Sequence, residues 1–408
     1  MASDQRRPGQ AGLEHLQPYP FERLRALLGD IKPPSDRDPV ALSIGEPRHP
    51  VPRLITRAAA EALHDSLGRY PASAGEPALR ETIATWLCGR FQLDAGDIDP
   101  DRHILPAAGT REALFAVTQA LLDPAERPDV AMPNPFYQIY EGAALLAGGV
   151  PRLLNTDPAS GLPSIHHWQA ADWARCGLIY LCSPGNPTGQ VIPQAFWDEL
   201  LERQSRHGFV IAADECYSEL YRDESDPPLG LLQACRKAGR TDFAGCLVFH
   251  SLSKRSNVPG LRSGFIAGDA RLIESFRAYR TYQGCALPLH VQQASRAAWQ
   301  DEAHVAANRA AYRDKFERAG SIIGDICPYR DPQAGFYIWL PVPDGDDEAF
   351  ARGLYRDAGV SVLPGRYLSR PSPEGDPGRG HVRLALVAET PVCEDALRRI
   401  RHFIEHSY

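Results

Sequence analysis

Short apolar runs alternate with amphipathic segments through the middle of the chain. From about residue 100 the apolar runs are HILPA, DVAMP, GLIYLCS, FVIAADE, GCLVFHS and SGFIAG, and segments with apolar residues at helical spacing lie between them. Short apolar strands separated by helices are typical of a mostly parallel, doubly wound sheet with helices on both faces. We therefore expect an α/β fold whose ligand site lies beyond the carboxyl ends of the strands.

The pattern differs toward both ends of the chain. Residues 52–67 and 78–91 show helical spacing, and Pro77 is placed where it can open the second helix. After a helical run that ends near residue 324, the short runs GFYIWLPV, GVSVLPG and HVRLALV alternate with helices. Since 408 residues exceed the usual size of one core, two domains are expected. We assign residues 51–325 to a large domain and residues 326–408 to a smaller α+β domain. Residues 1–50 form an N-terminal segment that we expect to be joined to the smaller domain.

Composition narrows the classes of function. A net charge of −7 gives no reason to expect nucleic acid as a partner. No stretch approaches the length of an apolar membrane span, and the N-terminus lacks the apolar core of a secretory signal, so we expect a cytoplasmic protein without membrane contacts. The nine cysteines are dispersed without Cys-x-x-Cys spacing, which predicts reduced thiols and no metal site. Lysine occurs at only four positions, which are Lys32, Lys237, Lys254 and Lys315.

Two segments that follow predicted strands are suited to bind a phosphate. Gly109 and Thr110 come directly after HILPA and open a predicted helix, whose free N–H groups attract anions; an ordinary N-cap is the structural alternative. The segment SLSKRSNVPGLRSG follows CLVFH and places Lys254 and Arg262 among hydroxyl groups. A lysine near other cations can lose its proton and become a nucleophile, and arginine with serine can hold a phosphate.

Three further polar side chains follow predicted strands. Asp214 ends the apolar run FVIAAD, where a carboxylate is costly unless it has a cationic partner, although an N-cap would also explain it. Tyr217 lies three residues later and would reach the same ligand if a helix begins there. Asn186 lies in SPGNPTG, a cluster of turn formers that is either a simple turn or a shaped ligand loop.

These motifs, in this order, resemble the class I and II aminotransferases over roughly residues 40 to 390. The resemblance implies the aspartate aminotransferase fold, which is fold type I of the pyridoxal-phosphate enzymes: a mostly parallel seven-stranded sheet in a large domain, plus a smaller α+β domain. It also implies pyridoxal 5′-phosphate as cofactor, amino acid and 2-oxo acid substrates, and a homodimer. Four stretches are closely similar to the succinyldiaminopimelate transaminases of this class: LQPYPFERLRALL, LSIGEPRHP, GTREALF and PNPFYQIYEGAALLAG. Those enzymes act in lysine and cell-wall precursor synthesis.

The resemblance also assigns roles to individual residues. Lys254 would carry the cofactor as a Schiff base and act as general base, and Asp214 would partner the pyridine nitrogen. Arg383, beside the Gly45 backbone, would bind the substrate α-carboxylate. The remaining cofactor contacts would be Asn186 and Tyr217 at the phenolic oxygen, Tyr137 (or Phe136) on the ring face, Gly109, Thr110, Ser251, Ser253 and Arg262 at the phosphate, and Tyr70 from the neighbouring subunit. The bonds Asn186–Pro187 and Asn134–Pro135 are often cis in this family.

The sequence departs from the family pattern at two places. Position 108 is alanine where many relatives have serine, so one phosphate hydroxyl is missing. The segment TYQGCALP (281–288) lacks the second arginine with which aspartate aminotransferases hold a side-chain carboxylate. This absence argues against an aspartate specialist and fits a longer substrate. The residues that hold a distal carboxylate stay open, with Arg23, Arg48 and Arg255 as candidates.

Two other functions remain open at this point. The same cofactor could catalyse β-elimination, or transamination of aromatic, branched or N-acetylated substrates, because motifs that bind the cofactor do not determine which bond breaks. A regulatory module of this fold fused to a DNA-binding domain is the alternative from another class. The short, proline-rich leader and the acidic net charge oppose that alternative.

Overall fold

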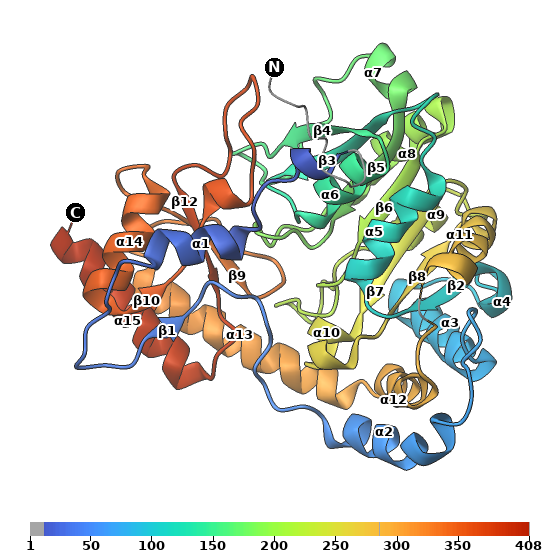
Figure 1. The fold of residues 1–408 in the computed structure, drawn as a ribbon, viewed down its shortest axis with the longest axis horizontal. Coiled ribbons are helices and arrows are strands. Elements are labelled where there is room, and N and C mark those ends of the chain that lie inside the picture. Colours follow the sequence, from blue (N-terminus) through green and yellow to red (C-terminus); the bar gives the residue numbers. More distant parts are fainter. Residues whose placement is uncertain (1–11, 285, 408) are drawn as a thin grey trace, which may run out of the picture.

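The computed structural model describes residues 12–284 and 286–407. These residues form two lobes, which Figure 1 shows side by side. The large lobe is built on a seven-stranded sheet and the small lobe on a three-stranded sheet. No helix of the described residues has the length and apolar character needed to cross a membrane.

The seven-stranded sheet has the order β2-β8-β7-β6-β5-β3-β4. All neighbouring pairs are parallel except those that involve β8, which runs antiparallel to both β2 and β7. The expected mostly parallel sheet is therefore confirmed. Its strands are β2 (Ile104–Ala107), β3 (Asp129–Asn134), β4 (Val150–Asn155), β5 (Cys176–Cys182), β6 (Val210–Asp214), β7 (Cys246–Ser251) and β8 (Gly264–Gly268).

Both faces of this sheet are covered by helices, which explains why its central strands are apolar throughout. Successive side chains of a strand point to opposite faces. In β5, Leu178 and Tyr180 pack into one hydrophobic core, and Ile179 and Leu181 pack into the other. The first core includes helices α5 (Thr110–Leu121), α6 (Ile139–Leu146) and α11 (Ala270–Gln283); the second includes α2 (Arg53–Ser66), α3 (Pro77–Phe91), α7 (Ala170–Arg175), α8 (Gln194–His207), α9 (Leu231–Lys237) and α12 (Leu289–Gln300).

The short helix α4 (Pro100–His103) leads into β2, and α10 (Leu252–Arg255) follows β7 directly. The longest helix, α13 (Ala303–Ile323), runs from the large lobe into the small lobe (Figure 1). Helix α3 begins at Pro77, as the sequence predicts. Three short 3-10 turns complete the described helices: η1 (Leu13–His15), η2 (Pro259–Leu261) and η3 (Gly365–Tyr367).

The small lobe has an antiparallel sheet in the order β11-β12-β9. Val40 and Leu42 pack into its core together with the C-terminal half of α13. This packing supports the predicted division near residues 50 and 325, which stays a prediction. The elements of the lobe are α1 (Pro20–Leu28), β1 (Val40–Ala41), β9 (Tyr337–Pro341), α14 (Asp347–Ala358), β10 (Val360–Ser361), β11 (Leu363–Pro364), β12 (His381–Ala385) and α15 (Thr390–Ser407).

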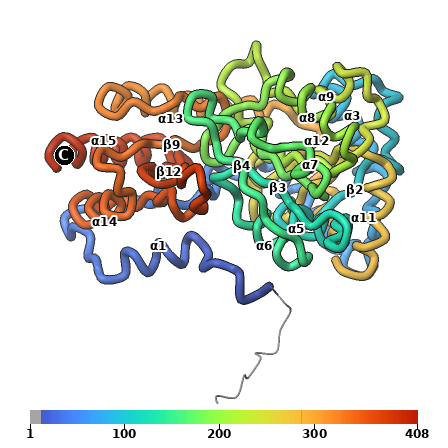
Figure 2. Tube along the Cα trace, turned by 90° about the horizontal axis from the view of Figure 1, so that it is seen from above, coloured from blue at the N-terminus to red at the C-terminus, as the bar shows by residue number. Residues whose placement is uncertain are grey.

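The N-terminal segment bridges the two lobes. Figure 2 shows that it runs from the region of α6, where η1 packs, past α1 to the side of α14. Strand β1 then pairs in parallel with β10. Helix α1 and strand β1 thus contact the small lobe while η1 contacts the large one, and the attachment of residues 1–50 to the small lobe stays a prediction; residues 1–11 lie outside the described part of the chain.

Candidate active site

A cavity of about 430 Å³ lies at the carboxyl edge of the seven-stranded sheet, where the two lobes meet. Residues at or just after the ends of β5, β6 and β7 line it, together with the N-terminus of α5 and segments of the small lobe. The structure brings together there eleven of the predicted site residues: Gly45, Thr110, Tyr137, Asn186, Asp214, Tyr217, Ser251, Ser253, Lys254, Arg262 and Arg383. Gly109 lies behind them, against Arg262. This agrees with the expected placement of ligands in sheets of this kind.

Lys254 stands on the one-turn helix α10, directly after β7. The Ser251 hydroxyl caps this turn by accepting from Ser253 N at 3.1 Å. The Lys254 Nζ donates to the Gly45 carbonyl oxygen at 2.5 Å. Burial, with smaller contributions from Arg383 and Arg262 nearby, lowers the pKa of Lys254 to about 8. More of this amine is therefore neutral near pH 7 than in an ordinary lysine, as a nucleophile or base requires.

Asp214, at the end of β6, is 5% exposed. Its carboxylate accepts from the Tyr140 hydroxyl at 2.7 Å and from Cys216 N at 3.3 Å. Within residues 12–284 and 286–407 it forms no ion pair, and burial raises its pKa. A buried carboxylate that faces a cavity without a cationic partner fits a ligand that brings a positive charge, such as a protonated pyridine nitrogen.

The N-terminus of α5 and Arg262 form an anion site. Gly109 has φ 93°, and a Cβ there would collide with the Arg262 guanidinium, so only glycine allows the two to approach. Helix α5 begins at Thr110, and the hydroxyls of Ser251 and Ser253 line the same cavity. Free helical N–H groups, a guanidinium and hydroxyls together suit a phosphate.

Arg383, on β12, offers a site for a carboxylate. Its side chain is 4% exposed and donates to Asn186 Oδ1 at 3.1 Å and to the Ser43 carbonyl at 2.9 Å. Its Nε is buried and has no acceptor among the residues that the structure describes. Tyr217 lies on the same wall, with its hydroxyl 3.1 Å from the Tyr337 hydroxyl, and burial raises the Tyr217 pKa. The unsatisfied Nε is a donor that a substrate carboxylate would satisfy.

The structure separates the two candidates for the ring face. Tyr137 lines the cavity, whereas Phe136 is 1% exposed and belongs to the core between α5, α6 and the sheet. Tyr70 does not reach the cavity of its own chain and is fully exposed. The bonds Asn134–Pro135 and Asn186–Pro187 are both cis, as is Ser183–Pro184, which the sequence analysis did not anticipate.

None of the three arginines suggested for a distal carboxylate lines the cavity. Arg255 is buried and donates to Glu302 at 2.5 Å and to the Ala298 carbonyl at 2.7 Å. Arg23 lies over the ring of Tyr367, with its guanidinium carbon 3.8 Å from the ring centre. Arg48 is exposed.

Arg111 is the cationic residue that the sequence analysis missed. It lines the cavity, and its guanidinium carbon lies 5.5 Å from the centre of the Tyr19 ring. In the described part of the chain no carboxylate pairs with it. Its position directly after Thr110, in the first turn of the helix that faces the anion site, was the available signal. Tyr140 was missed as well, although it follows Tyr137 by one helical turn.

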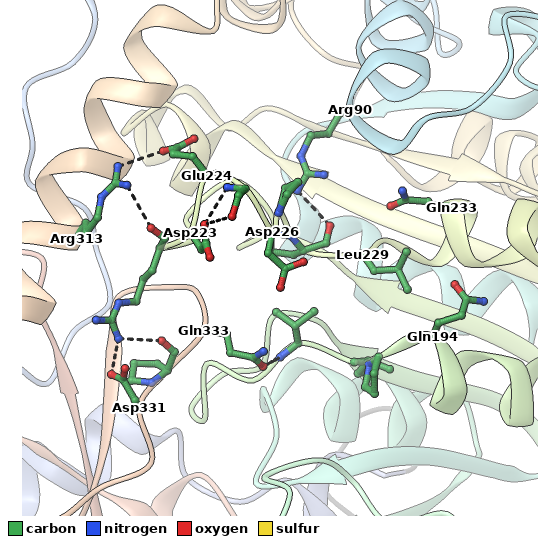
Figure 3. Close-up of a pocket in the computed structure, with 18 of the residues that line it drawn as sticks. Arg90, Gln194, Asp223, Glu224, Asp226, Leu229, Gln233, Arg313, Asp331 and Gln333 are labelled. Atoms are coloured by element: carbon green, nitrogen blue, oxygen red, sulfur yellow. Dashed lines mark hydrogen bonds and ion pairs between the residues drawn. The ribbon is translucent and has the colours of Figure 1, made fainter.

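A larger cavity, of about 1090 Å³, lies on another part of the surface and is shown in Figure 3. Its arginines already have acceptors: Arg90 donates to Glu219 at 2.7 Å, and Arg313 donates to Glu224 at 3.1 Å. The figure shows polar side chains around an open crevice, and the lysine that lines this cavity, Lys237, is exposed, so it lacks the buried setting of Lys254. We therefore place the chemistry in the smaller cavity.

The described residues include no group of three or more histidine, cysteine, aspartate or glutamate side chains arranged to hold a metal ion. The eight cysteines in the described ranges carry free thiols, and Cys285 lies outside those ranges.

A lysine with a lowered pKa, a buried unpaired carboxylate and a phosphate-type anion site fit pyridoxal 5′-phosphate, and with the sheet topology they define a fold type I enzyme of that cofactor. The family model for aminotransferase class I and II matches residues 37–400, and the chain belongs to this family. The expected fold, cofactor and class are confirmed.

Named relatives narrow the comparison further. The LL-diaminopimelate aminotransferase of Desulforudis audaxviator is 31% identical over 95% of this chain and 96% of its own length. A crystal structure of an aminotransferase from Neisseria meningitidis is 48% identical, with a TM-score of 0.91 over 95% of this chain and 98% of that one. A probable N-succinyldiaminopimelate aminotransferase from Thermus thermophilus is 25% identical, with a TM-score of 0.82 over 94% of this chain and 100% of that one.

Proposed function

We propose that this aminotransferase takes the amino group of N-succinyl-LL-2,6-diaminopimelate and transfers it to 2-oxoglutarate, giving N-succinyl-2-amino-6-oxopimelate and glutamate. The reaction would serve lysine synthesis in the cytoplasm. The named relatives support a substrate of the diaminopimelate type, since one is an LL-diaminopimelate aminotransferase and another is a probable N-succinyldiaminopimelate aminotransferase.

The charges on the cavity wall carry the preference for the succinylated substrate. Arg111 and Arg383 line the cavity, and Asp214 is the only carboxylate among the described residues that do so. The far end of free diaminopimelate carries an ammonium group, which would need a carboxylate partner. Succinylation replaces that ammonium by an amide and adds a carboxylate, which suits a cationic wall. Four apolar side chains that can pack on the methylene groups are Phe21, Ile44, Leu363 and Leu368.

Each polar group on the wall has a task in this reaction. Bound pyridoxal phosphate supplies an electron-withdrawing ring that makes the substrate Cα–H bond acidic. The Lys254 Nζ, held at the Gly45 carbonyl, is the base that would take the proton from the substrate Cα and pass it to the C4′ carbon of the cofactor. The Asp214 carboxylate stabilises the positive charge on the ring nitrogen, and Arg383 fixes the α-carboxylate so that the Cα proton faces Lys254.

Other residues hold the cofactor in place. Arg262, Thr110, Ser251, Ser253 and the Gly109 backbone would surround its phosphate. Asn186 and Tyr217 would bind its phenolic oxygen, and Tyr137 would stack on the ring.

We further propose a homodimer in which Tyr70 reaches the phosphate of the partner subunit. The support is that Tyr70, an aromatic residue in a loop before α3, is fully exposed in the single chain. Sedimentation equilibrium should show a dimer, and Tyr70→Phe should weaken cofactor binding. A stable, fully active monomer would contradict the dimer.

A panel of amino donors with 2-oxoglutarate as acceptor tests the substrate. We expect kcat/KM for the succinylated donor to exceed that for LL-diaminopimelate by about 100-fold, because an unpaired ammonium would otherwise be buried. Aspartate, aromatic and branched donors should be slower still. Higher kcat/KM for LL-diaminopimelate would overturn the preference, and release of ammonia with pyruvate from a β-substituted donor as the main reaction would indicate a β-lyase.

A further inference from the structure

A second lysine is buried in this chain, away from the cavity. Lys315, on α13, is 1% exposed and does not line the active site. Its Nζ lies 2.6 Å from His49 Nε2 and donates to the Leu386 carbonyl at 3.1 Å. No carboxylate of the described ranges forms an ion pair with it. Burying an amine that has only neutral partners costs free energy, which suggests that the hydrogen bonds of Lys315 have a function.

Those hydrogen bonds lead to the main chain of Lys254. His49 Nδ1 lies 2.7 Å from Asn308 Oδ1. The Asn308 amide nitrogen faces the carbonyl oxygens of Lys254 and Arg255, at 3.3 and 3.4 Å. The chain from Lys315 therefore ends at the peptide group of the residue that performs the chemistry.

The donors and acceptors of this chain fix the tautomer of His49. Carbonyl oxygens only accept, so the Asn308 amide nitrogen must face them and its Oδ1 must be an acceptor. Asn257 Nδ2 donates to the same Oδ1 at 2.9 Å. His49 must then donate from Nδ1, which leaves Nε2 as the acceptor for the Lys315 ammonium.

His49 also ends the segment 43–49, which has no helix or strand. Two carbonyls of this segment hold two of the cationic groups of the active site: Ser43 accepts from Arg383 at 2.9 Å, and Gly45 accepts from Lys254 Nζ at 2.5 Å. A segment without backbone ladder bonds depends on such side-chain contacts for its conformation. His49 thus fixes the end of the segment whose start and middle touch the substrate-binding and catalytic residues.

We propose that Lys315, His49 and Asn308 form a positioning network for transamination, which holds the Gly45 carbonyl and the Lys254 peptide so that Lys254 Nζ is aimed at the substrate Cα. None of the three lines the cavity, so they act through Lys254 and the segment 43–49. This proposal rests on the aminotransferase activity and not on the succinylated substrate. A negative result in the substrate panel would therefore leave it standing, and a negative result in the experiment below would leave the proposed substrate standing.

Two variants of Lys315 separate the hydrogen bond from other effects. Lys315→Met has a similar length and no donor, whereas Lys315→Gln keeps an uncharged N–H donor toward His49 Nε2 on a side chain one bond shorter. In the holoenzyme, Lys315→Met should lower kcat by roughly 10- to 100-fold, because a small misplacement of a catalytic group has an effect of that size. Lys315→Gln should recover most of this loss.

A readout on the apoenzyme distinguishes positioning from loss of stability. The pH dependence of Lys254 arylation, followed by peptide mass, reports the pKa of this amine. Without the Gly45 acceptor, the ammonium form of Lys254 loses a hydrogen bond, so in Lys315→Met the midpoint should move down by about 0.5 pH unit or more. The charged groups near Lys254 are Glu46, Arg262 and Arg383, and near Lys315 they are Asp314 and Glu389; all stay in place, as do the thiols of Cys216 and Cys393.

Asn308→Leu provides a second variant should Lys315→Met fail to fold. It removes both the acceptor for His49 and the donor to the Lys254 carbonyl and adds no charge, so it should shift the midpoint in the same direction. The control is Gln204→Leu, which removes a buried side chain on α8 that bonds to the Phe209 carbonyl and is remote from the cavity. It should lower the melting temperature and leave the Lys254 midpoint unchanged. The proposal is wrong if Lys315→Met and Asn308→Leu behave like this control, or if Lys315→Gln is no better than Lys315→Met.

Discussion

Lys254 and Lys315 are both shielded from water, and burial lowers the pKa of each to about 8. Their surroundings differ. Lys254 Nζ faces a cavity that Asp214 and Arg262 also line, whereas Lys315 is enclosed by His49 and the Leu386 carbonyl. The comparison shows that a lowered lysine pKa does not by itself define a catalytic group. An adjoining cavity with complementary charges for a ligand is also required.

The difference follows from where the two lysines lie in the fold. Lys254 comes directly after β7, at the edge of the sheet where strand ends and the N-terminus of α5 converge. Lys315 lies in the middle of α13, on a helix whose C-terminal half packs into the core of the small lobe. Strand ends leave space for a ligand, whereas a helix packed against a core leaves none.

Replacing each lysine in turn gives the largest expected effect. Lys254→Ala removes the proposed attachment point and base, so kcat should fall by about 10⁴-fold or more, beyond the loss expected for Lys315→Met. Steady-state assays with N-succinyl-LL-2,6-diaminopimelate as donor and 2-oxoglutarate as acceptor measure this difference. Lys237→Ala is the control, because Lys237 is exposed and should be replaceable without loss. Equal losses of kcat in the Lys254 and Lys315 variants would contradict the distinction between a lysine that faces the cavity and one that is enclosed.

Asp214→Asn tests the role of the carboxylate that lines the same cavity as Lys254. Lys315 has no ion-paired carboxylate in the described part of the chain. We expect kcat to fall by roughly 100- to 1,000-fold, because the charge opposite the ring nitrogen is lost. The apoenzyme gives a second signal. Burial raises the Asp214 pKa above its ordinary value of 3.8, so the folded state holds this proton more firmly, and the resulting stability is lost as pH rises through the raised pKa.

Asparagine does not titrate, so the melting temperature of the Asp214→Asn apoenzyme relative to wild type should increase as the pH rises above the ordinary value of 3.8 toward the raised pKa of Asp214. Thermal melts across this range measure the difference. A difference in melting temperature that does not change with pH would mean that burial does not disfavour the ionised form of Asp214. The cavity would then already supply a positive charge to this carboxylate.

Arg111→Gln should have a smaller and selective effect. If the cavity beside Lys254 is shaped for acidic substrates, kcat/KM for 2-oxoglutarate should drop by about 10-fold, equivalent to about 1.4 kcal/mol, while that for pyruvate changes little. Arg23→Gln is the matched control, since Arg23 lies on Tyr367 and does not line the cavity. If Arg111→Gln instead weakens cofactor binding and affects both 2-oxo acids equally, Arg111 binds the cofactor phosphate and not the substrate.

Residues that terminate strands could be placed from the sequence alone. Asp214, Asn186 and Lys254 follow apolar runs, and parallel strands bring their carboxyl ends to one edge, so the pattern and the resemblance predicted one site for all three. Arg383 came from the resemblance alone, because its bond to Asn186 spans 197 positions and leaves no local pattern.

Contacts between distant segments were not predictable in this way. His49 and Lys315 are 266 positions apart, and neither lies in a motif for the cofactor. Arg255 looked as available as Arg111 in the sequence, but it folds inward to pair with Glu302, and only the packed structure separates them. The proposed role of Tyr70 depends on a second subunit, which a single chain does not contain.

Reduction of the holoenzyme with borohydride, followed by peptide mass mapping, tests the central claim most directly. This treatment fixes the cofactor to the amine that carries it. We predict that the added mass lies on the peptide with Lys254 and on no peptide with Lys32, Lys237 or Lys315. A label on Lys315, or a colourless protein without any label, would contradict the account.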